Sequence, residues 1–259
     1  MAAKSGVKQV IQNVARLFAE PATKPPLIPA KVKYKSPDNN VDTLPTGFRP
    51  LDKALGIGGL PHGKIIELIG PGDTLISNGA VSVSTRIAAK VQRQQEIVTI
   101  IDMTHSFDPW QAERCGLIAP HLLLTRPDTV FEALTNLENA TRNASLVVVI
   151  MGAVTELMHG VKANALKTLL RRLQTIVQRS NSVCLFVTTA QKNNPFASQN
   201  YPPGFPLANV AHLRLWLQEE TWTRKSGVTT AYKANLTVIK NDLAMAGTGA
   251  NIRIKMVSP

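Results

Sequence analysis

The sequence is poor in the residues that mark secreted and membrane proteins. Its 259 residues include only two cysteines, Cys115 and Cys184, which give neither a disulfide framework nor a paired metal-binding spacing. The longest apolar run, at 145–154, is far shorter than the roughly 18 to 20 residues that a membrane-spanning helix needs. We therefore expect a cytoplasmic protein of a reducing compartment that does not enter a membrane.

Acidic residues are also scarce. The chain has 17 acidic and 29 basic residues, so its formal net charge at pH 7 is +12. This excess favours a polyanionic partner, and nucleic acid is the usual one for an intracellular protein with a pI near 10.0. The basic residues are spread along the chain, however, and Arg171, Arg172 and Arg179 on a predicted helix are typical of a solvated face. The charge indicates a class of partner without locating its binding surface.

The hydrophobic pattern predicts an α/β fold. Short apolar runs rich in β-branched residues alternate with helical segments, and they lie at 65–69, 97–101, 146–150 and 183–188. Such alternation is typical of a mainly parallel sheet with helices on both faces. Two later segments, 212–220 and 232–241, alternate apolar with polar residues, which predicts half-exposed antiparallel edge strands.

Three regions follow one another along the chain. Residues 1–20 are predicted to form an amphipathic helix, residues 21–43 a basic, Pro-rich linker, and residues 44–259 the α/β core. The apolar stripe of the helix, a candidate docking surface for a partner, comprises Val7, Val10, Ile11, Val14, Leu17 and Phe18. The same basic helix also has features of an organellar transit peptide, a reading that we rank below docking.

A candidate nucleotide loop follows the first apolar strand. A phosphate-binding loop has the pattern G-x-x-x-x-G-K-[ST], in which the lysine neutralises phosphate and the hydroxyl holds Mg²⁺. Counting from Gly70 with normal spacing places Leu75, Ile76 and Ser77 at the last three positions. A loop longer by four residues instead places Gly79, Ala80 and Val81 there, and a helix then continues; we prefer this second register. The degenerate loop thus comprises Gly70, Pro71, Gly72, Gly79, Ala80 and Val81.

Neither register supplies the lysine. A charge-assisted hydrogen bond to phosphate is worth roughly 1.5 to 3 kcal/mol, so tight binding of ATP and Mg²⁺ is not expected. Taken singly, the glycines around the loop are as well explained by the tight turns of any α/β domain. Their combination with later segments is more informative.

Three segments together resemble the core of the RecA recombinase family. They are LPTGFRPLDKALGIGGLPHGKIIELIGP at 44–71, IDMTHSFDP at 101–109 and RPDTVFEALT at 126–135, in the family's order and spacing. The similarity runs from about Leu44 to Asn241. It implies a RecA-like P-loop ATPase core, without the family's C-terminal domain.

The resemblance also implies functional positions that this chain does not fill. The glutamate that activates water in the family corresponds to Thr104, and threonine is a poor general base. The strand expected to end in a Mg²⁺-binding aspartate offers only Ile150, Met151 and Gly152. Gln191 lies near the position of the glutamine that senses the γ-phosphate. Of two lysines that reach a neighbouring subunit's nucleotide, Lys240 is retained and the other is Asp242.

His105 and Asp108 have two possible roles. They could be read as a catalytic pair, but both lie where a strand passes into a helix, and Asp108 precedes Pro109 as an N-cap does. Turn formation and helix capping are the favoured roles.

Two loops correspond to those that bind DNA in the family. They lie at 156–165 and 191–209, and aromatic side chains among basic and polar residues suit stacking on unpaired bases. The candidate DNA-binding residues are Lys162, Lys192, Phe196, Tyr201 and Phe205. The alternative is that these segments form compact surface loops.

Three functions remain open. The leading hypothesis is a catalytically inactive RecA-like accessory protein of DNA repair, recombination or damage-induced (SOS) synthesis, similar to the mutasome component ImuA. Its partners would be RecA, a translesion polymerase subunit or another copy of the chain, with single-stranded DNA as a further candidate. The second hypothesis is a divergent NTPase in which Lys64, Arg86 or Lys90 replaces the missing lysine. The third is an inhibitor of another protein's polymerisation, similar to the RecA-folded inhibitor SulA.

Overall fold

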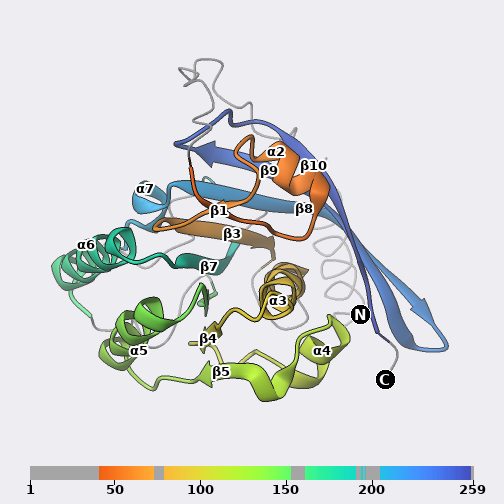
Figure 1. Ribbon diagram of the computed structural model, residues 1–259, viewed down its shortest axis with the longest axis horizontal. Helices are drawn as coiled ribbons and strands as arrows, with labels where there is room; N and C mark the ends of the chain where they lie inside the picture. The colour runs from red at the N-terminus through yellow and green to blue at the C-terminus, as the bar shows by residue number, and fades with distance from the viewer. Residues whose placement is uncertain are drawn as a thin grey trace, which may run out of the picture. The chain divides into compact units, whose positions relative to one another are not determined.

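The computed structural model describes residues 41–72, 79–152, 161–190, 194, 196 and 205–257. Its main feature is an eight-stranded sheet with the strand order β10-β9-β8-β3-β7-β6-β4-β5 (Figure 1). The strands are β1 (Thr43–Leu44), β2 (Leu60–Pro61), β3 (Ile65–Pro71), β4 (Val98–Asp102), β5 (Leu122–Thr125), β6 (Leu146–Ile150), β7 (Val183–Ala190), β8 (Leu213–Lys225), β9 (Val228–Asn241) and β10 (Gly249–Lys255). The helices are α2 (Arg49–Ala54), α3 (Gly79–Gln92), α4 (Pro109–Arg114), α5 (Val130–Asn143), α6 (Ala163–Arg179) and α7 (Leu207–Val210), with a 3₁₀ turn at Ala119–His121.

The middle of the sheet is parallel. Strands β3, β4, β6 and β7 are apolar throughout or nearly so, and each pairs in parallel with its neighbours. Strand β8 also runs parallel to β3, whereas β9 and β10 are antiparallel additions beyond it. The predicted α/β class, with a mainly parallel sheet and antiparallel strands at one side, is confirmed.

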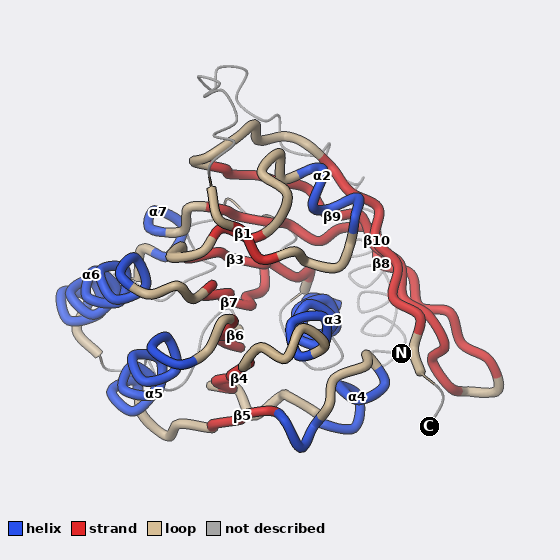
Figure 2. The backbone as a smooth tube through the Cα atoms, in the orientation of Figure 1, coloured by secondary structure: helices blue, strands red, loops and turns tan. Residues whose placement is uncertain are grey.

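Helices cover both faces of this sheet (Figure 2). One face packs against α2, α3 and α4, and the other packs against α5, α6 and α7. Strand β6 illustrates the division, because Val148 belongs to the first apolar cluster and Val147 to the second. Such a strand has no solvated face, which is why its sequence reads as an unbroken apolar run.

Strand β8 departs from the prediction. The alternation of apolar and polar residues at 212–220 and 232–241 predicts half-exposed antiparallel edge strands, but β8 lies inside the sheet, between β3 and β9, and β9 lies between β8 and β10. Its polar residue Arg214 is 6% exposed because it forms an ion pair with Glu67 on β3, and Trp216 is 7% exposed. The prediction was wrong because a buried charge with a partner on the next strand gives the same sequence pattern as a solvated residue.

Strands β8 and β9 form a long hairpin. Their turn contains Ser226 and Gly227, both with positive φ, as the tightest right-twisted hairpin turns require. The register shifts between Gln218 and Thr221, where β8 carries one residue more than β9.

The structure also bears on the cysteines and on membranes. Cys115 and Cys184 are both buried and free. Among the described residues, no helix has the length and apolar character needed to cross a bilayer. The predicted N-terminal helix and the linker up to residue 40 lie outside the described residues.

Candidate functional site

The candidate site lies where the parallel strands end. The carboxyl ends of β3, β4, β6 and β7 share one edge of the sheet, which is where α/β proteins bind ligands. Gly70 and Pro71 are the last residues of β3 and pair with Thr189 and Ala190 of β7. Gly72 follows with φ of +85°. A strand therefore runs into the segment that the sequence predicts to be a degenerate nucleotide loop.

Helix α3 begins on the other side of that segment. Its first residues are Gly79, Ala80 and Val81, the three residues of the longer register. Leu75, Ile76 and Ser77 of the shorter register lie outside the described residues. Ala80 is fully buried, and Val81 is partly buried against the apolar cluster. The start of α3 therefore presents small or apolar side chains at the positions that the longer register predicts for the lysine and the hydroxyl.

The three basic residues considered as substitutes for that lysine lie away from the start of α3. Lys64 precedes β3, so its backbone lies at the opposite end of the strand, about 20 Å from Gly70 at a rise of about 3.3 Å per residue. Arg86 lies about 10 Å along α3 from Gly79, and its Nη1 donates a 2.9 Å hydrogen bond to the carbonyl of Cys115. Lys90 lies about 16 Å along the same helix, with its side chain against Gly47.

A carboxylate occupies the start of α3 instead. Glu220 of β8 accepts a hydrogen bond from the backbone N–H of Gly79. The hydroxyl of Tyr232 on β9 donates to Oε1 of Glu220 at 2.6 Å. A methyl group at Gly79 would overlap both the carboxylate and the Tyr232 hydroxyl, so a larger residue there requires these side chains to shift. Burial raises the pKa of Glu220, while the hydrogen bonds from Tyr232 and Gly79 oppose that change.

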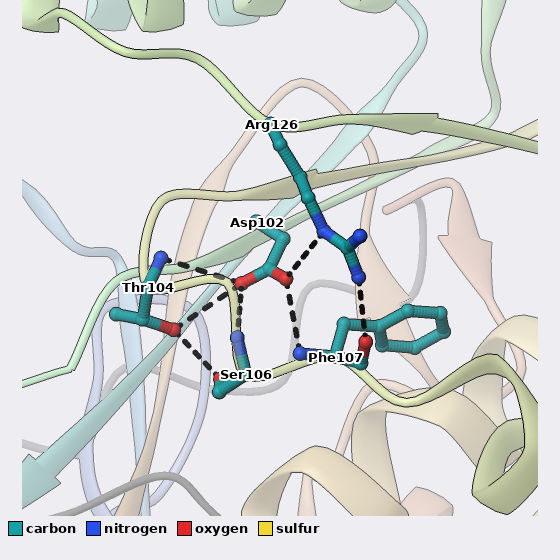
Figure 3. Close-up of polar contacts among 5 residues, drawn as sticks. All are labelled: Asp102, Thr104, Ser106, Phe107 and Arg126. Carbon is teal, nitrogen blue, oxygen red and sulfur yellow. Dashed lines mark hydrogen bonds and ion pairs between the residues drawn. The ribbon is translucent and has the colours of Figure 1, made fainter.

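Figure 3 shows a second carboxylate, Asp102 at the end of β4, surrounded by donors. Its Oδ1 accepts hydrogen bonds from the N–H groups of Thr104 and Ser106 at 3.3 and 3.2 Å, and from the Thr104 hydroxyl at 3.2 Å. Its Oδ2 accepts from the N–H of Phe107 at 3.0 Å and pairs with Nε of Arg126 at 3.4 Å. Arg126 also donates to the carbonyl of Phe107 at 2.8 Å. Asp102 thus organises the turn that follows β4.

The resemblance to the RecA family predicts that Thr104, in this turn, corresponds to the family's catalytic glutamate. The Thr104 hydroxyl donates a hydrogen bond to Asp102 and lies 2.7 Å from Oγ of Ser106. His105 has φ of +53°, as a turn residue does. Asp108 accepts a 2.9 Å hydrogen bond from the N–H of Trp110 and precedes Pro109 as the N-cap of α4. The predicted turn and capping roles of His105 and Asp108 are confirmed.

The end of β6 is apolar. Ile150 is the last residue of the strand, and Met151, 1% exposed, packs in the apolar cluster under α5 and α6. Gly152 follows with φ of +73°. Across the described ranges, no group of three or more His, Cys, Asp or Glu side chains could hold a metal ion. The residues at this strand end do not fit Mg²⁺, which prefers carboxylate oxygens.

Lys240 makes its polar contacts with residues of its own chain. Its Nζ donates to the carbonyl of Ala211 at 2.6 Å and to that of Asn209 at 3.2 Å, at the C-terminus of α7. It also lies 3.7 Å from Oδ2 of Asp242. A cation at the C-terminus of a helix satisfies carbonyl groups that have no partner within the helix.

The candidate DNA-binding residues do not all fall within the description. Lys192 and Tyr201 lie outside it, as do Gln191 and the apolar stripe of the N-terminal helix. Lys162 is exposed next to the first residue of α6, and Phe196 is 46% exposed. Phe205 is half-buried, and its side chain packs against the apolar cluster under α5 and α6.

Four residues of the site were not singled out from the sequence: Asp102, Arg126, Glu220 and Tyr232. Asp102 ends an apolar strand at the ligand-binding edge, which is a usable signal. Glu220 and Tyr232 carry no such signal, because only the pairing of β8 with β9 brings them to α3.

The fold, with a strand leading to a helix at the ligand-binding edge of the sheet, defines an α/β protein of RecA-like architecture. A family model for the RecA N-terminal domain matches residues 29–258. The chain therefore belongs to the RecA recombinase family.

Individual relatives agree with this assignment. Protein RecA of Thermus thermophilus is 30% identical over 238 residues, which cover 84% of this chain and 68% of that protein. Protein RecA of Bacillus subtilis strain 168 is 29% identical over 226 residues, covering 80% of this chain and 63% of that protein. The crystal structure of the RadB recombinase matches with a TM-score of 0.58 at 19% identity, covering 82% of this chain and 96% of that one. At that identity, the last match supports the fold alone.

Proposed function

We propose that this RecA-family chain is a noncatalytic accessory protein of DNA repair or damage-induced synthesis. In this proposal it acts in the cytoplasm by binding partner proteins, with single-stranded DNA as a second partner. It neither binds ATP tightly nor turns it over.

The observation that carries the proposal is the composition of the start of α3. A helix N-terminus attracts phosphate, but in this family's pattern a lysine and a hydroxyl add the cation and the Mg²⁺ ligand. Here the corresponding residues are Ala80 and Val81, and the carboxylate of Glu220 lies at the same helix end. A carboxylate at that point repels a triphosphate rather than neutralising it.

Two further features support the loss of turnover. Thr104, at the position of the catalytic base, hydrogen-bonds Asp102 and Ser106 and is a poor base at neutral pH. The apolar end of β6 at Ile150 and Met151 offers no metal ligand. Nucleotide binding, metal binding and proton removal are thus weakened together, which favours an inactive protein over a divergent NTPase.

The catalytic part of the proposal is tested on the purified full chain. ATP binding is measured by isothermal titration calorimetry with Mg²⁺, and phosphate release is followed with and without single-stranded DNA. We expect no binding in the micromolar range and no turnover. Mg²⁺-dependent hydrolysis that disappears on substitution of Arg86 or Lys90 would establish the divergent NTPase instead.

The accessory part is tested in the source cells. A tagged chain is recovered after DNA damage, and the expected partners are RecA, a translesion polymerase subunit or another copy of the chain. A second tagged chain tests docking through the helix: in it, Val10 and Val14 of the predicted N-terminal stripe are replaced with glutamate, which removes the apolar character of the stripe. Recovery of the same partners by the wild type and by this variant would contradict docking through the helix.

DNA binding separates the accessory reading from an inhibitor of polymerisation. A gel shift with single-stranded DNA is run at two salt concentrations, because contacts to phosphates weaken as salt rises. Binding that weakens with salt supports the accessory protein. Partner binding without any DNA affinity would favour the inhibitor.

A further inference from the structure

Glu220 reaches α3 because of the β-bulge in β8. Gln218 pairs with Asn235 of β9 and Thr221 pairs with Lys233, so the stretch of β8 between them holds an additional residue. An extra residue reverses the side-chain alternation and redirects a side chain. Glu220 consequently lies on the same side of the hairpin as the buried Tyr232, facing the first residue of α3.

The contacts of Glu220 are those of an anion at a helix N-terminus. The N–H group is that of Gly79, the first residue of α3 that the structure describes. Glu220 accepts a hydrogen bond from it. The helix dipole adds a favourable interaction with negative charge at this end.

Tyr232 holds the carboxylate in place from the other side. Tyr232 is fully buried and its ring lies 4.4 Å, centroid to centroid, from that of Trp222. Its hydroxyl therefore has a fixed position, 2.6 Å from Oε1 of Glu220. The absence of a side chain at Gly79 leaves the space that the carboxylate and the hydroxyl fill.

From this geometry we propose that Glu220 is a built-in anion that occupies the phosphate position at the start of α3 and keeps phosphate ligands out. The inference rests on the proposed function, because it gives a physical cause for the absence of nucleotide binding. It goes further in assigning that cause to one side chain that lies far from the nucleotide loop in the sequence.

The test measures pyrophosphate binding to the full chain by calorimetry and by the rise in melting temperature. Glu220→Ala removes both the charge and the volume, Glu220→Gln removes the charge alone, and Glu113→Gln is the control on an exposed glutamate of α4. We expect Glu220→Ala to bind pyrophosphate at least tenfold more tightly than the wild type, Glu220→Gln to fall between them, and Glu113→Gln to match the wild type.

Equal pyrophosphate affinities for the wild type and both Glu220 variants would overturn the inference. If Glu220→Ala does not fold, as judged by circular dichroism, Glu220→Gln decides alone, since it keeps the size of the side chain. An increase that Glu113→Gln reproduces would also overturn it, because general charge would then be the cause. ATP turnover by the wild type, in contrast, refutes the proposed function whatever the variants do.

Discussion

Glu67 and Arg214 form a buried ion pair across strands β3 and β8, with Oε2 and Nε 2.6 Å apart. The two residues are direct register partners, and their side chains are 0% and 8% exposed. The second oxygen of Glu67 accepts a 2.8 Å hydrogen bond from Thr188 of β7. One carboxylate thus links β3, the strand that leads into the predicted nucleotide loop, to both of its neighbours, β7 and β8.

Removal of one partner of this pair is expected to destabilise the protein strongly. Arg214→Met leaves the Glu67 carboxylate buried without its cation, and such a change typically costs about 3 to 5 kcal/mol. Glu67→Met should cost a similar amount, whereas the double variant should cost less than either because no isolated charge remains. Urea denaturation of the single and double variants measures this. Additive losses would contradict the pairing.

Gly79 and Gly72 should respond differently to alanine. Gly72 has φ of +85°, and no heavy atom lies within 4 Å of the place that an alanine Cβ would take, so Gly72→Ala should cost about 1 to 2 kcal/mol through the backbone alone. Gly79→Ala must displace Glu220 and Tyr232, and we expect a loss of about 3 kcal/mol from overpacking. Thermal melting compares the two variants. A milder effect at Gly79 than at Gly72 would mean that Tyr232 can move aside.

Asp102 should matter more than its ion-pair partner. Asp102→Ala leaves the N–H groups of Ser106 and Phe107 without their acceptor, and we expect a loss of about 3 kcal/mol. The Arg126 side chain is 42% exposed, so Arg126→Gln should cost no more than about 1 kcal/mol. Hydrogen exchange of the Phe107 amide, read by NMR, should accelerate strongly only in Asp102→Ala. Equal acceleration in both variants would mean that Arg126 stabilises the turn as much as Asp102 does, which contradicts the prediction.

The raised pKa of Glu220 predicts how stability changes with pH. Burial raises this pKa above its ordinary value of 4.5, so the folded protein favours the protonated carboxyl more than the unfolded chain does. The corresponding stability is fully present below the unfolded pKa and is lost as the pH rises through the higher folded pKa. The free energy of unfolding of the wild type, minus that of Glu220→Gln, should therefore fall as the pH rises from 4.5. A difference that is constant or grows with pH would contradict the assignment.

The sequence predicts the central architecture well because burial on two faces leaves a clear signal. Strands β3, β4, β6 and β7 appear as mostly apolar runs, and α3 lies where the longer register of the nucleotide loop predicts a helix, from Gly79 on. The cap at Asp108 was also predictable, because capping depends on residues that are adjacent in the chain.

Long-range polar contacts were not predictable in the same way. The sequence predicts a solvated residue at Arg214, but Arg214 is paired with Glu67 of β3. Glu220 would likewise be taken for a surface acid, but the β-bulge turns it toward α3. In both cases the partner lies on another strand whose register a single sequence does not reveal. The apolar pattern therefore predicts the central strands of the sheet. The polar contacts between strands depend on strand pairing, which the sequence pattern does not predict.

The strand order has a consequence for how the protein is made. Strand β3 ends at Pro71, but its neighbours β7 and β8 begin only at Val183 and Leu213. During translation, this apolar strand leaves the ribosome long before either final neighbour exists, and contacts so distant in sequence form slowly. Strand β3 is therefore exposed to non-native association during synthesis. We expect a ribosome-bound chaperone to protect this segment.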